Sequence, residues 1–209
     1  MQGKERGPIH LAIPFYRQHS DFTCGPASLI MAMKYFDFDL CHGVDLENDL
    51  WREGNLIEIY ATGRYGLAFS AASRGFSVKI ISNISRVDFV GNATTPVEGL
   101  NPQILEDHFR ERRARCRRLG VKEREGAITD TLLYTSLRSN HVPLIVISTL
   151  YNSEDDLPHW VAVTGIDDKY MYFNDPSDLK KRKRKIALID LRKFIGYHGD
   201  QYMVEIWKQ

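Results

Sequence analysis

The chain has 209 residues, of which 43% are hydrophobic, 11% aromatic and 26% charged. This composition can form a hydrophobic core, and it excludes disordered, collagen-like and low-complexity chains. Lys and Arg number 28 against 27 Asp and Glu, so the net charge of +1 argues against nucleic acid or an anionic membrane as a partner. We expect residues 1–209 to form a single domain.

The sequence offers no candidate for a membrane span or a secretory signal. The longest apolar run, Val142 to Leu150, has about half of the ~20 residues that a spanning helix needs, and Met1 to Tyr16 lacks the apolar stretch of a signal peptide. The three cysteines are odd in number and show no C-x-x-C spacing. We therefore expect reduced thiols in a cytoplasmic protein, without disulfides or a structural metal site.

Helical patterns fill the first two thirds of the chain. The clearest runs from Pro26 to Phe36, where Leu29, Ile30 and Met33 recur at helical spacing and predict a buried helix. The further predicted helices are Leu46 to Tyr60, Tyr65 to Arg74, Pro102 to Leu119 and Thr129 to Ser139, with one strand at Phe76 to Ile81.

The last third of the chain changes to strand patterns. The predicted strands are Leu144 to Thr149, Trp160 to Ile166, Tyr170 to Asn174, Lys185 to Ile189 and Tyr202 to Trp207. Because helices come first and strands last, we expect an α+β fold in which N-terminal helices pack on a mostly antiparallel C-terminal sheet.

Cys24 stands directly before the buried helix. A thiol at a helix N-terminus faces unpaired backbone N–H groups and the positive end of the helix dipole, and both favour the thiolate. Gly25 would allow a second backbone or a substrate to come close, and Pro26 suits a first helical turn. Taken alone, the segment fits an ordinary buried cysteine as well as it fits a nucleophile.

A later segment supplies a histidine and a carboxylate. Two predicted strands flank a polar turn at Asp167 and Asp168, which indicates a hairpin. If the turn is centred near Asp168, His159 lies opposite positions 176 to 178, and the Asp175 carboxylate can reach its imidazole. Such a carboxylate fixes the tautomer and stabilises the imidazolium, leaving the second ring nitrogen for a nucleophile.

The order Gln18, Cys24, His159 and Asp175-Pro176 resembles the papain-like cysteine peptidases, and most of all the bacteriocin-processing peptidases that cleave double-glycine leaders. The resemblance implies a papain-like fold and a cysteine peptidase or amide hydrolase acting on a peptide or protein. It further implies that Cys24 is the nucleophile, His159 the general acid/base and Asp175 its orienting partner. Gln18 and the backbone N–H of Cys24 would stabilise the oxyanion.

The residues leave several alternatives open. Asn174 adjoins Asp175, and strand alternation allows only one of the two to contact His159. Because relatives such as phytochelatin synthases use the same triad in transpeptidation, a thiol-dependent acyl or peptidyl transferase is a second interpretation. A non-catalytic peptide-binding module on the same fold is a third. The stretch from Val87 to Gly126 has no role that the sequence assigns. The remaining histidines lack metal-ligand spacing, so we expect no metal and no cofactor.

Two basic runs break the even charge distribution. Lys180 to Lys185, KKRKRK, is expected in a loop or hairpin tip, either as a solvated segment or as a surface for an acidic partner. Arg110 to Arg118 is expected to form the exposed side of a helix whose buried stripe includes Cys116. We expect Cys41 to be structural, because its neighbour His42 points away from it in either a strand or a helix.

Overall fold

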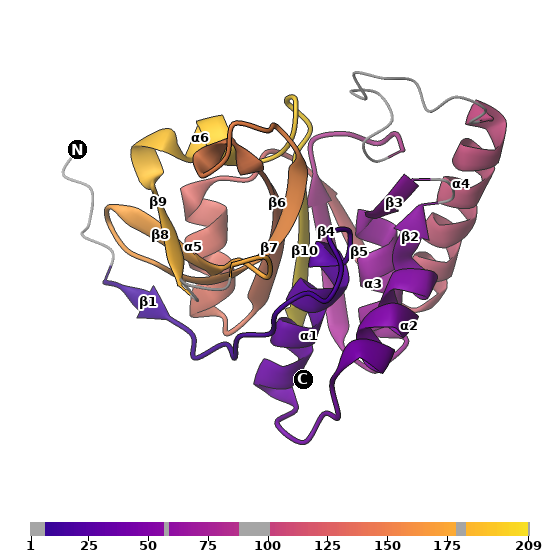
Figure 1. Ribbon diagram of the computed structural model, residues 1–209, viewed down its shortest axis with the longest axis horizontal. Coiled ribbons are helices and arrows are strands. Elements are labelled where there is room, and N and C mark those ends of the chain that lie inside the picture. The colour runs from indigo at the N-terminus through magenta and orange to yellow at the C-terminus, as the bar shows by residue number, and fades with distance from the viewer. Residues whose placement is uncertain (1–6, 57–58, 88–100, 179–182, 209) are drawn as a thin grey trace.

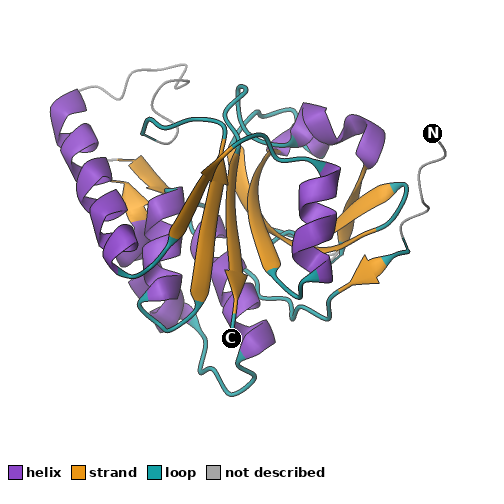
Figure 2. Ribbon diagram, turned by 180° about the vertical axis from the view of Figure 1, so that it is seen from behind, coloured by secondary structure: helices purple, strands orange, loops and turns teal. Residues whose placement is uncertain are grey.

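A large sheet with helices on both faces forms the centre of the molecule, as Figures 1 and 2 show for a computed structural model that describes residues 7–56, 59–87, 101–178 and 183–208. The helices are α1 (Cys24–Phe36), α2 (Val44–Gly54), α3 (Arg64–Ala72), α4 (Pro102–Arg118), α5 (Asp130–Arg138) and α6 (Leu191–Phe194). Between α2 and α3, the strands β2 (Asn55–Leu56) and β3 (Ile59–Thr62) form a small hairpin.

The large sheet is antiparallel except at one edge. Its strands lie in the spatial order β5 (Lys122–Glu125), β4 (Ser77–Ser82), β10 (Tyr202–Trp207), β6 (Val142–Ser148), β7 (Pro158–Ile166), β8 (Tyr170–Asn174) and β9 (Arg184–Ala187), with the short β1 (Ile9–His10) paired to β7. Only the β4–β5 pair is parallel among the described strands. The predicted α+β class with a mostly antiparallel sheet is confirmed.

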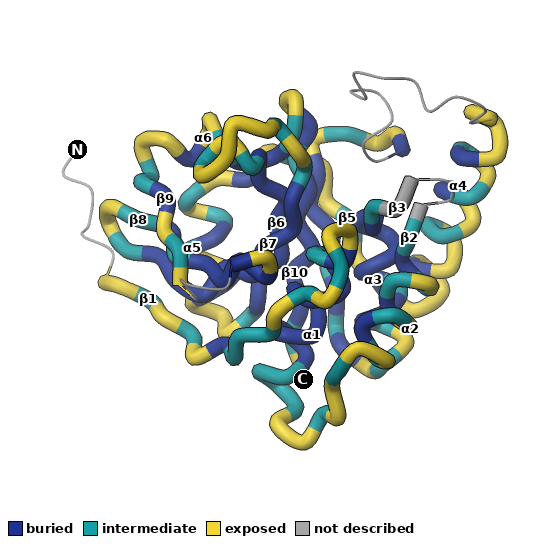
Figure 3. Tube along the Cα trace, viewed as in Figure 1, coloured by how far each residue is buried: buried dark blue, intermediate teal, exposed yellow. Residues whose placement is uncertain are grey.

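Two hydrophobic cores fill the two faces of the sheet. One packs α1 to α4 against the sheet, and Leu29, Ile30 and Met33 of α1 are fully buried in it, as the dark trace of α1 in Figure 3 shows. The other core lies beneath α5 and α6 and includes Leu133 and Leu191. The alternation of side chains along the strands supplies both cores, because successive residues face opposite sides of a sheet.

Several predicted boundaries differ from those observed. The helix predicted to reach Tyr60 ends at Gly54, where the backbone turns extended at Asn55. Two helices also approach closely at this point, since a Cβ added to Gly66 of α3 would lie 2.6 Å from the Cα of Gly54. Residues 57 and 58, the last part of that predicted helix, lie outside the described residues.

The sequence patterns did not predict β1 or β5, and they predicted a start of β9 at Lys185, one residue after the observed start at Arg184. Lys122–Glu125 reads K-E-R-E, without apolar alternation, and is held as an edge strand by backbone pairing with β4. Arg184, which was expected in a loop or hairpin tip, begins β9, and Lys185 lies in this strand as its predicted range required, although the strand ends at Ala187 and not at Ile189. Of the part of the chain that the structure describes, no helix has the length and apolarity to cross a membrane.

Candidate active site

Cys24 is the first residue of α1, held by a tight loop that precedes the helix. The hydroxyl of Thr23 donates to the carbonyl of Ser20 at 2.9 Å and accepts its N–H at 3.1 Å. Gly25 is closely packed, because an added Cβ would lie 3.1 Å from Cβ of Thr62 and 3.2 Å from Cδ1 of Trp160. The expected space beside Gly25 is therefore occupied by the protein's own side chains.

His159 lies near the start of β7 and pairs with Asp175, the residue that follows β8. Nε2 of His159 is 2.7 Å from Oδ1 of Asp175, and the two residues are 8% and 1% exposed. Asn174 faces elsewhere, because its side-chain amide donates to the carbonyl of Ile13 at 3.2 Å. Of the two candidates at the end of β8, Asp175 is the one in contact with the imidazole.

Three further groups hold the Asp175 carboxylate. Oδ1 accepts the backbone N–H of Ser177 at 2.9 Å and its hydroxyl at 2.7 Å, and Oδ2 accepts the hydroxyl of Tyr151. Burial raises the pKa of Asp175, but the hydrogen bond and charge of His159 and the bonds from Tyr151 and Ser177 outweigh it. The pKa of this carboxyl therefore lies well below its ordinary value, and the group is ionised at neutral pH.

Cys24 and His159 shift each other's protonation. Burial raises the pKa of the Cys24 thiol, but a hydrogen bond and the charge of His159, with backbone hydrogen bonds from Trp160 and Gly25, bring it below its ordinary value. Burial lowers the pKa of His159, but its bonds to Asp175 and Cys24 raise it to about 10. Since Nε2 is used by Asp175, Nδ1 is the nitrogen available to the sulfur. The favoured state is a thiolate beside an imidazolium.

Gln18 lies in the loop before Cys24 and is anchored at both ends. Its backbone N–H donates to the carbonyl of Pro176 at 3.0 Å, which ties this loop to the residue after Asp175. Its side-chain Nε2 donates to the carbonyl of Ser20 at 2.8 Å. The side-chain nitrogen carries a second hydrogen that this bond does not use, but Gln18 is not among the residues that line the cavity at Cys24 and His159.

A buried carboxylate on α2 fixes the segment that carries Gln18. Glu47 is fully buried, and its two oxygens accept the hydroxyl of Tyr16 and the backbone N–H of His19, each at 2.8 Å. These donors flank Gln18 in the chain. The position of Gln18 therefore depends on α2 as well as on the loop itself.

A small cavity of about 170 Å³ opens at Cys24 and His159. Its walls are mainly apolar, and Phe22 and Leu157 on its rim are 39% and 57% exposed. The lining residues are Asp21, Phe22, Cys24, Ala61, Thr62, Thr149, Leu157, Pro158, His159 and Trp160. Sulfur and imidazole thus lie beside a space that can receive part of a ligand.

The comparison with protein families identifies the chain. A family model described as Peptidase_C39 like family matches residues 13–192, which include the Gln18, Cys24, His159 and Asp175 positions. The chain belongs to this Peptidase_C39 like family. No curated protein matches the sequence.

The fold of this C39-like chain is shared with a solved structure. A candidate C39-like peptidase from Bacillus anthracis superposes with a TM-score of 0.55 and 14% sequence identity, over 98% of this chain and 99% of that one. At this identity the likeness shows the fold alone, which is a papain-like α+β arrangement. The predicted fold class is confirmed.

Two contacts of the C39-like site were not expected from the sequence. Ser177 follows Asp175-Pro176, and an aspartate that accepts the N–H two residues on is a recognisable Asx turn, so this contact had a local signal. Tyr151 lies 24 residues before Asp175, and nothing in the sequence links the two. Among the described residues, no group of three or more His, Cys, Asp or Glu could hold a metal ion.

The other two cysteines differ from Cys24. Cys116 is buried in α4 as expected, where burial raises its pKa to about 12. Cys41 was expected to be structural, but it is exposed in the loop between α1 and α2. Neither lines the cavity at His159.

Proposed function

We propose that this C39-like protein is a cysteine peptidase that hydrolyses an amide bond of a peptide substrate. In this proposal Cys24 is the nucleophile, His159 the general acid/base and Asp175 the group that orients the ring. The observation that supports it is the placement of Cys24 and His159 at one cavity, with His159 hydrogen-bonded to Asp175. In this setting the thiol pKa is lowered and the imidazole pKa is raised.

The first half of the proposed reaction is acylation. The Cys24 thiolate attacks the carbonyl carbon and forms a C–S bond, and the carbonyl oxygen becomes an oxyanion. Nε2 of Gln18 and the backbone N–H of Cys24 donate to this oxygen; each such donor is worth roughly 10² to 10³ in rate. The His159 imidazolium protonates the leaving nitrogen as the C–N bond breaks, which leaves a thioester on Cys24.

The second half is deacylation. Neutral His159 takes a proton from a water molecule, whose oxygen attacks the thioester carbon. The C–S bond then breaks, the carboxylic acid leaves, and the thiolate and imidazolium are restored. An amine or thiol in place of water would give the transferase reaction, and comparing their rates of trapping the thioester with the rate of hydrolysis separates the two activities.

The resemblance to double-glycine leader peptidases makes a peptide with a Gly-Gly site the first substrate to test. We further propose that the protein works in the cytoplasm, because its proposed nucleophile must stay reduced and its three cysteines are unpaired.

Selective alkylation tests the proposed nucleophile. We expect iodoacetamide at neutral pH to modify Cys24 before Cys41 and Cys116, with the sites identified by mass spectrometry. Cys41 is a demanding internal control, since it is more exposed than Cys24 and would react first if access alone decided the rate. His159→Ala should slow the reaction of Cys24 and leave that of Cys41 unchanged. Equal rates at Cys24 and Cys41 would exclude an activated nucleophile.

A further inference from the structure

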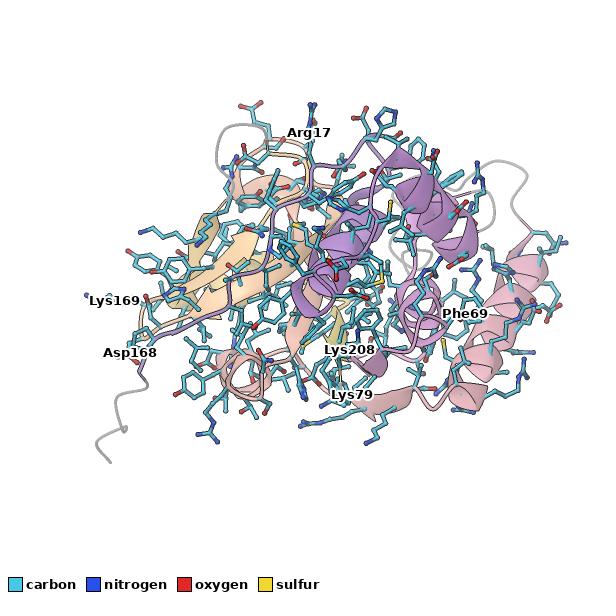
Figure 4. The ribbon with its side chains drawn as sticks, turned by 90° about the horizontal axis from the view of Figure 1, so that it is seen from below. Arg17, Phe69, Lys79, Asp168, Lys169 and Lys208 are labelled. Atoms are coloured by element: carbon cyan, nitrogen blue, oxygen red, sulfur yellow. The ribbon has the colours of Figure 1, made fainter. Side chains whose placement is uncertain are left out.

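A second and larger cavity, of about 600 Å³, lies between β1 and the β8–β9 hairpin. It shares no lining residue with the cavity at Cys24. The residues that line it are His10, Leu11, Thr164, Tyr172, Lys183, Arg184 and Lys185. Figure 4 shows the β7–β8 turn of this region, labelled at Asp168 and Lys169, at the end of the molecule where the N-terminal strand lies.

The hollow follows from one row of residues across four strands. His10 pairs with Gly165, Gly165 with Tyr172 and Tyr172 with Lys185. Residues directly opposite in a sheet share a face, and the missing side chain of Gly165 leaves room for the His10 ring, whose Nδ1 an added Cβ would overlap. The glycine also lets β1 approach, because a Cβ at Gly165 would lie 2.6 Å from the carbonyl oxygen of Ile9. The rings of His10 and Tyr172 lie 4.8 Å apart.

The charge of the lining is positive. Lys183 and Lys185 are exposed, and neither makes an ion pair within the described part of the chain, while the Lys185 ammonium lies 4.0 Å from the centre of the Tyr170 ring. None of the lining residues is an Asp or Glu. Both carboxylate oxygens of Asp167, which lies beside Tyr172, already accept hydrogen bonds. Oδ2 accepts the Tyr172 hydroxyl, and Oδ1 accepts the N–H groups of residues 169 and 170. The lining therefore includes two lysines that no described carboxylate pairs with.

Arg184 connects this cavity to the proposed triad. Its Nε donates to the carboxylate of Asp178, and its guanidinium lies 5.7 Å from the centre of the Tyr151 ring, whose hydroxyl holds Asp175. A ligand in the cavity would therefore contact β9, whose Arg184 packs on Tyr151, the residue that bonds the Asp175 carboxylate. Residues 180–182 extend the basic run in the sequence but lie outside the described residues.

We propose that this cavity is an exosite that binds the carboxylate side chains of an acidic peptide segment. Two lysines supply the charge, and Leu11 and Tyr172 supply apolar surface for the methylene stems of glutamates. The volume exceeds what a single phosphate needs, and a net charge of +1 gives no overall attraction for a nucleic acid. The role of this segment as part of a substrate rests on the proposed peptidase function, whereas the binding itself does not.

The test is a binding experiment on full-length Cys24→Ala protein, which cannot turn over the probe. Fluorescence anisotropy would compare a fluorescein-labelled hexa-glutamate peptide with a hexa-glutamine peptide of the same length. We expect the acidic peptide to bind more tightly, with an affinity that falls as salt is added. The double variant Lys183→Glu with Lys185→Glu should weaken its binding by about tenfold or more.

A matched control separates the cavity from bulk charge. Arg118→Glu with Lys122→Glu makes the same change in net charge at α4 and β5, and β5 is the opposite edge of the sheet from β9. This control should retain binding. Equal binding of the two peptides, or equal loss in both double variants, would overturn the proposal. So would displacement of the peptide by inorganic phosphate or a short oligonucleotide at a lower concentration than unlabelled hexa-glutamate. Alkylation of Cys24 in a Lys183/Lys185 double variant that retains Cys24 reports on the proposed nucleophile independently.

Discussion

Tyr151 donates a hydrogen bond to Oδ2 of Asp175, the carboxylate oxygen that His159 does not use. The two donors therefore hold the carboxylate from both sides, and the Ser177 contacts complete its coordination. Burial with the Asp175 and Asp178 charges raises the pKa of Tyr151, so the phenol remains a donor across the working pH range. We interpret Tyr151 as a positioning residue that keeps Asp175 ionised and aligned with the imidazole.

Tyr151→Phe removes this donor and keeps the ring. We expect kcat/KM for peptide hydrolysis to fall on the order of tenfold, because a buried hydrogen bond to a charged group is worth about 1.5 to 3 kcal/mol. The pKa of Asp175 should rise while the carboxyl stays ionised. Without the Tyr151 donor the carboxylate should lose its alignment with the ring and stabilise the imidazolium less, which moves the alkaline limb of the pH profile to lower pH. Tyr35→Phe, which removes a hydroxyl bonded to Asn140 far along the chain, is the matched control. A pH profile identical to that of the unmodified protein would show that Tyr151 has only a packing role.

The pH dependence of alkylation and hydrolysis should differ in a defined way. The Cys24 thiolate forms above a pKa that lies below 9.0, and the His159 imidazolium persists up to about 10. The rise in Cys24 alkylation should therefore have its midpoint below pH 9.0, and hydrolysis should decline near pH 10 as the proton donor is lost.

In His159→Ala the rise in alkylation should move to higher pH. The hydrogen bond and charge that lower the thiol pKa are then gone, and burial, which raises it, remains. Stopped-flow alkylation over a pH series measures both proteins. An unchanged midpoint would mean that the ring does not stabilise the thiolate.

Local patterns were sufficient for the elements that carry the candidate site. The apolar spacing after Cys24 predicted α1, and counting from the turn at Asp168 put His159 opposite positions 176 to 178. The observed register pairs Ala162 with Asn174, and this brings the imidazole to Asp175. Helical spacing and hairpin register are both short-range properties, which explains why one sequence can reveal them.

Contacts between distant segments could not be read in the same way. Tyr151 reaches Asp175 from a short 3-10 turn, Thr149–Tyr151, and Glu47 reaches residues 16 and 19 from α2. Neither contact leaves a periodic signal, because each depends on how whole elements pack. The cavity between β1 and the β8–β9 hairpin could not be predicted from the sequence either, because it forms only when β1 and β8 both pair with β7 at Gly165.

Gln18 is expected to act on the oxyanion and not on the thiol. Gln18→Ala should reduce kcat by roughly 10² to 10³, the usual effect of losing one oxyanion donor. Alkylation of Cys24 should be unchanged, because the groups that lower the thiol pKa are His159 and the backbone of residues 25 and 160. Steady-state kinetics and Cys24 alkylation, measured on the same preparation, test the two expectations. If kcat and the alkylation rate fall together, Gln18 supports the structure of the loop and does not act on the oxyanion.

Glu47 should combine a stability effect with an effect on Gln18. In Glu47→Gln an amide nitrogen faces the Tyr16 hydroxyl or the His19 N–H, so one buried donor loses its acceptor. We expect the free energy of unfolding, measured in urea, to fall by about 1 to 3 kcal/mol, with kcat reduced and Cys24 alkylation retained. Glu111→Gln, at an exposed ion pair with Arg115, is the control and should change stability by less than about 1 kcal/mol. If kcat is retained while stability falls, Glu47 supports the fold but does not position the oxyanion donor.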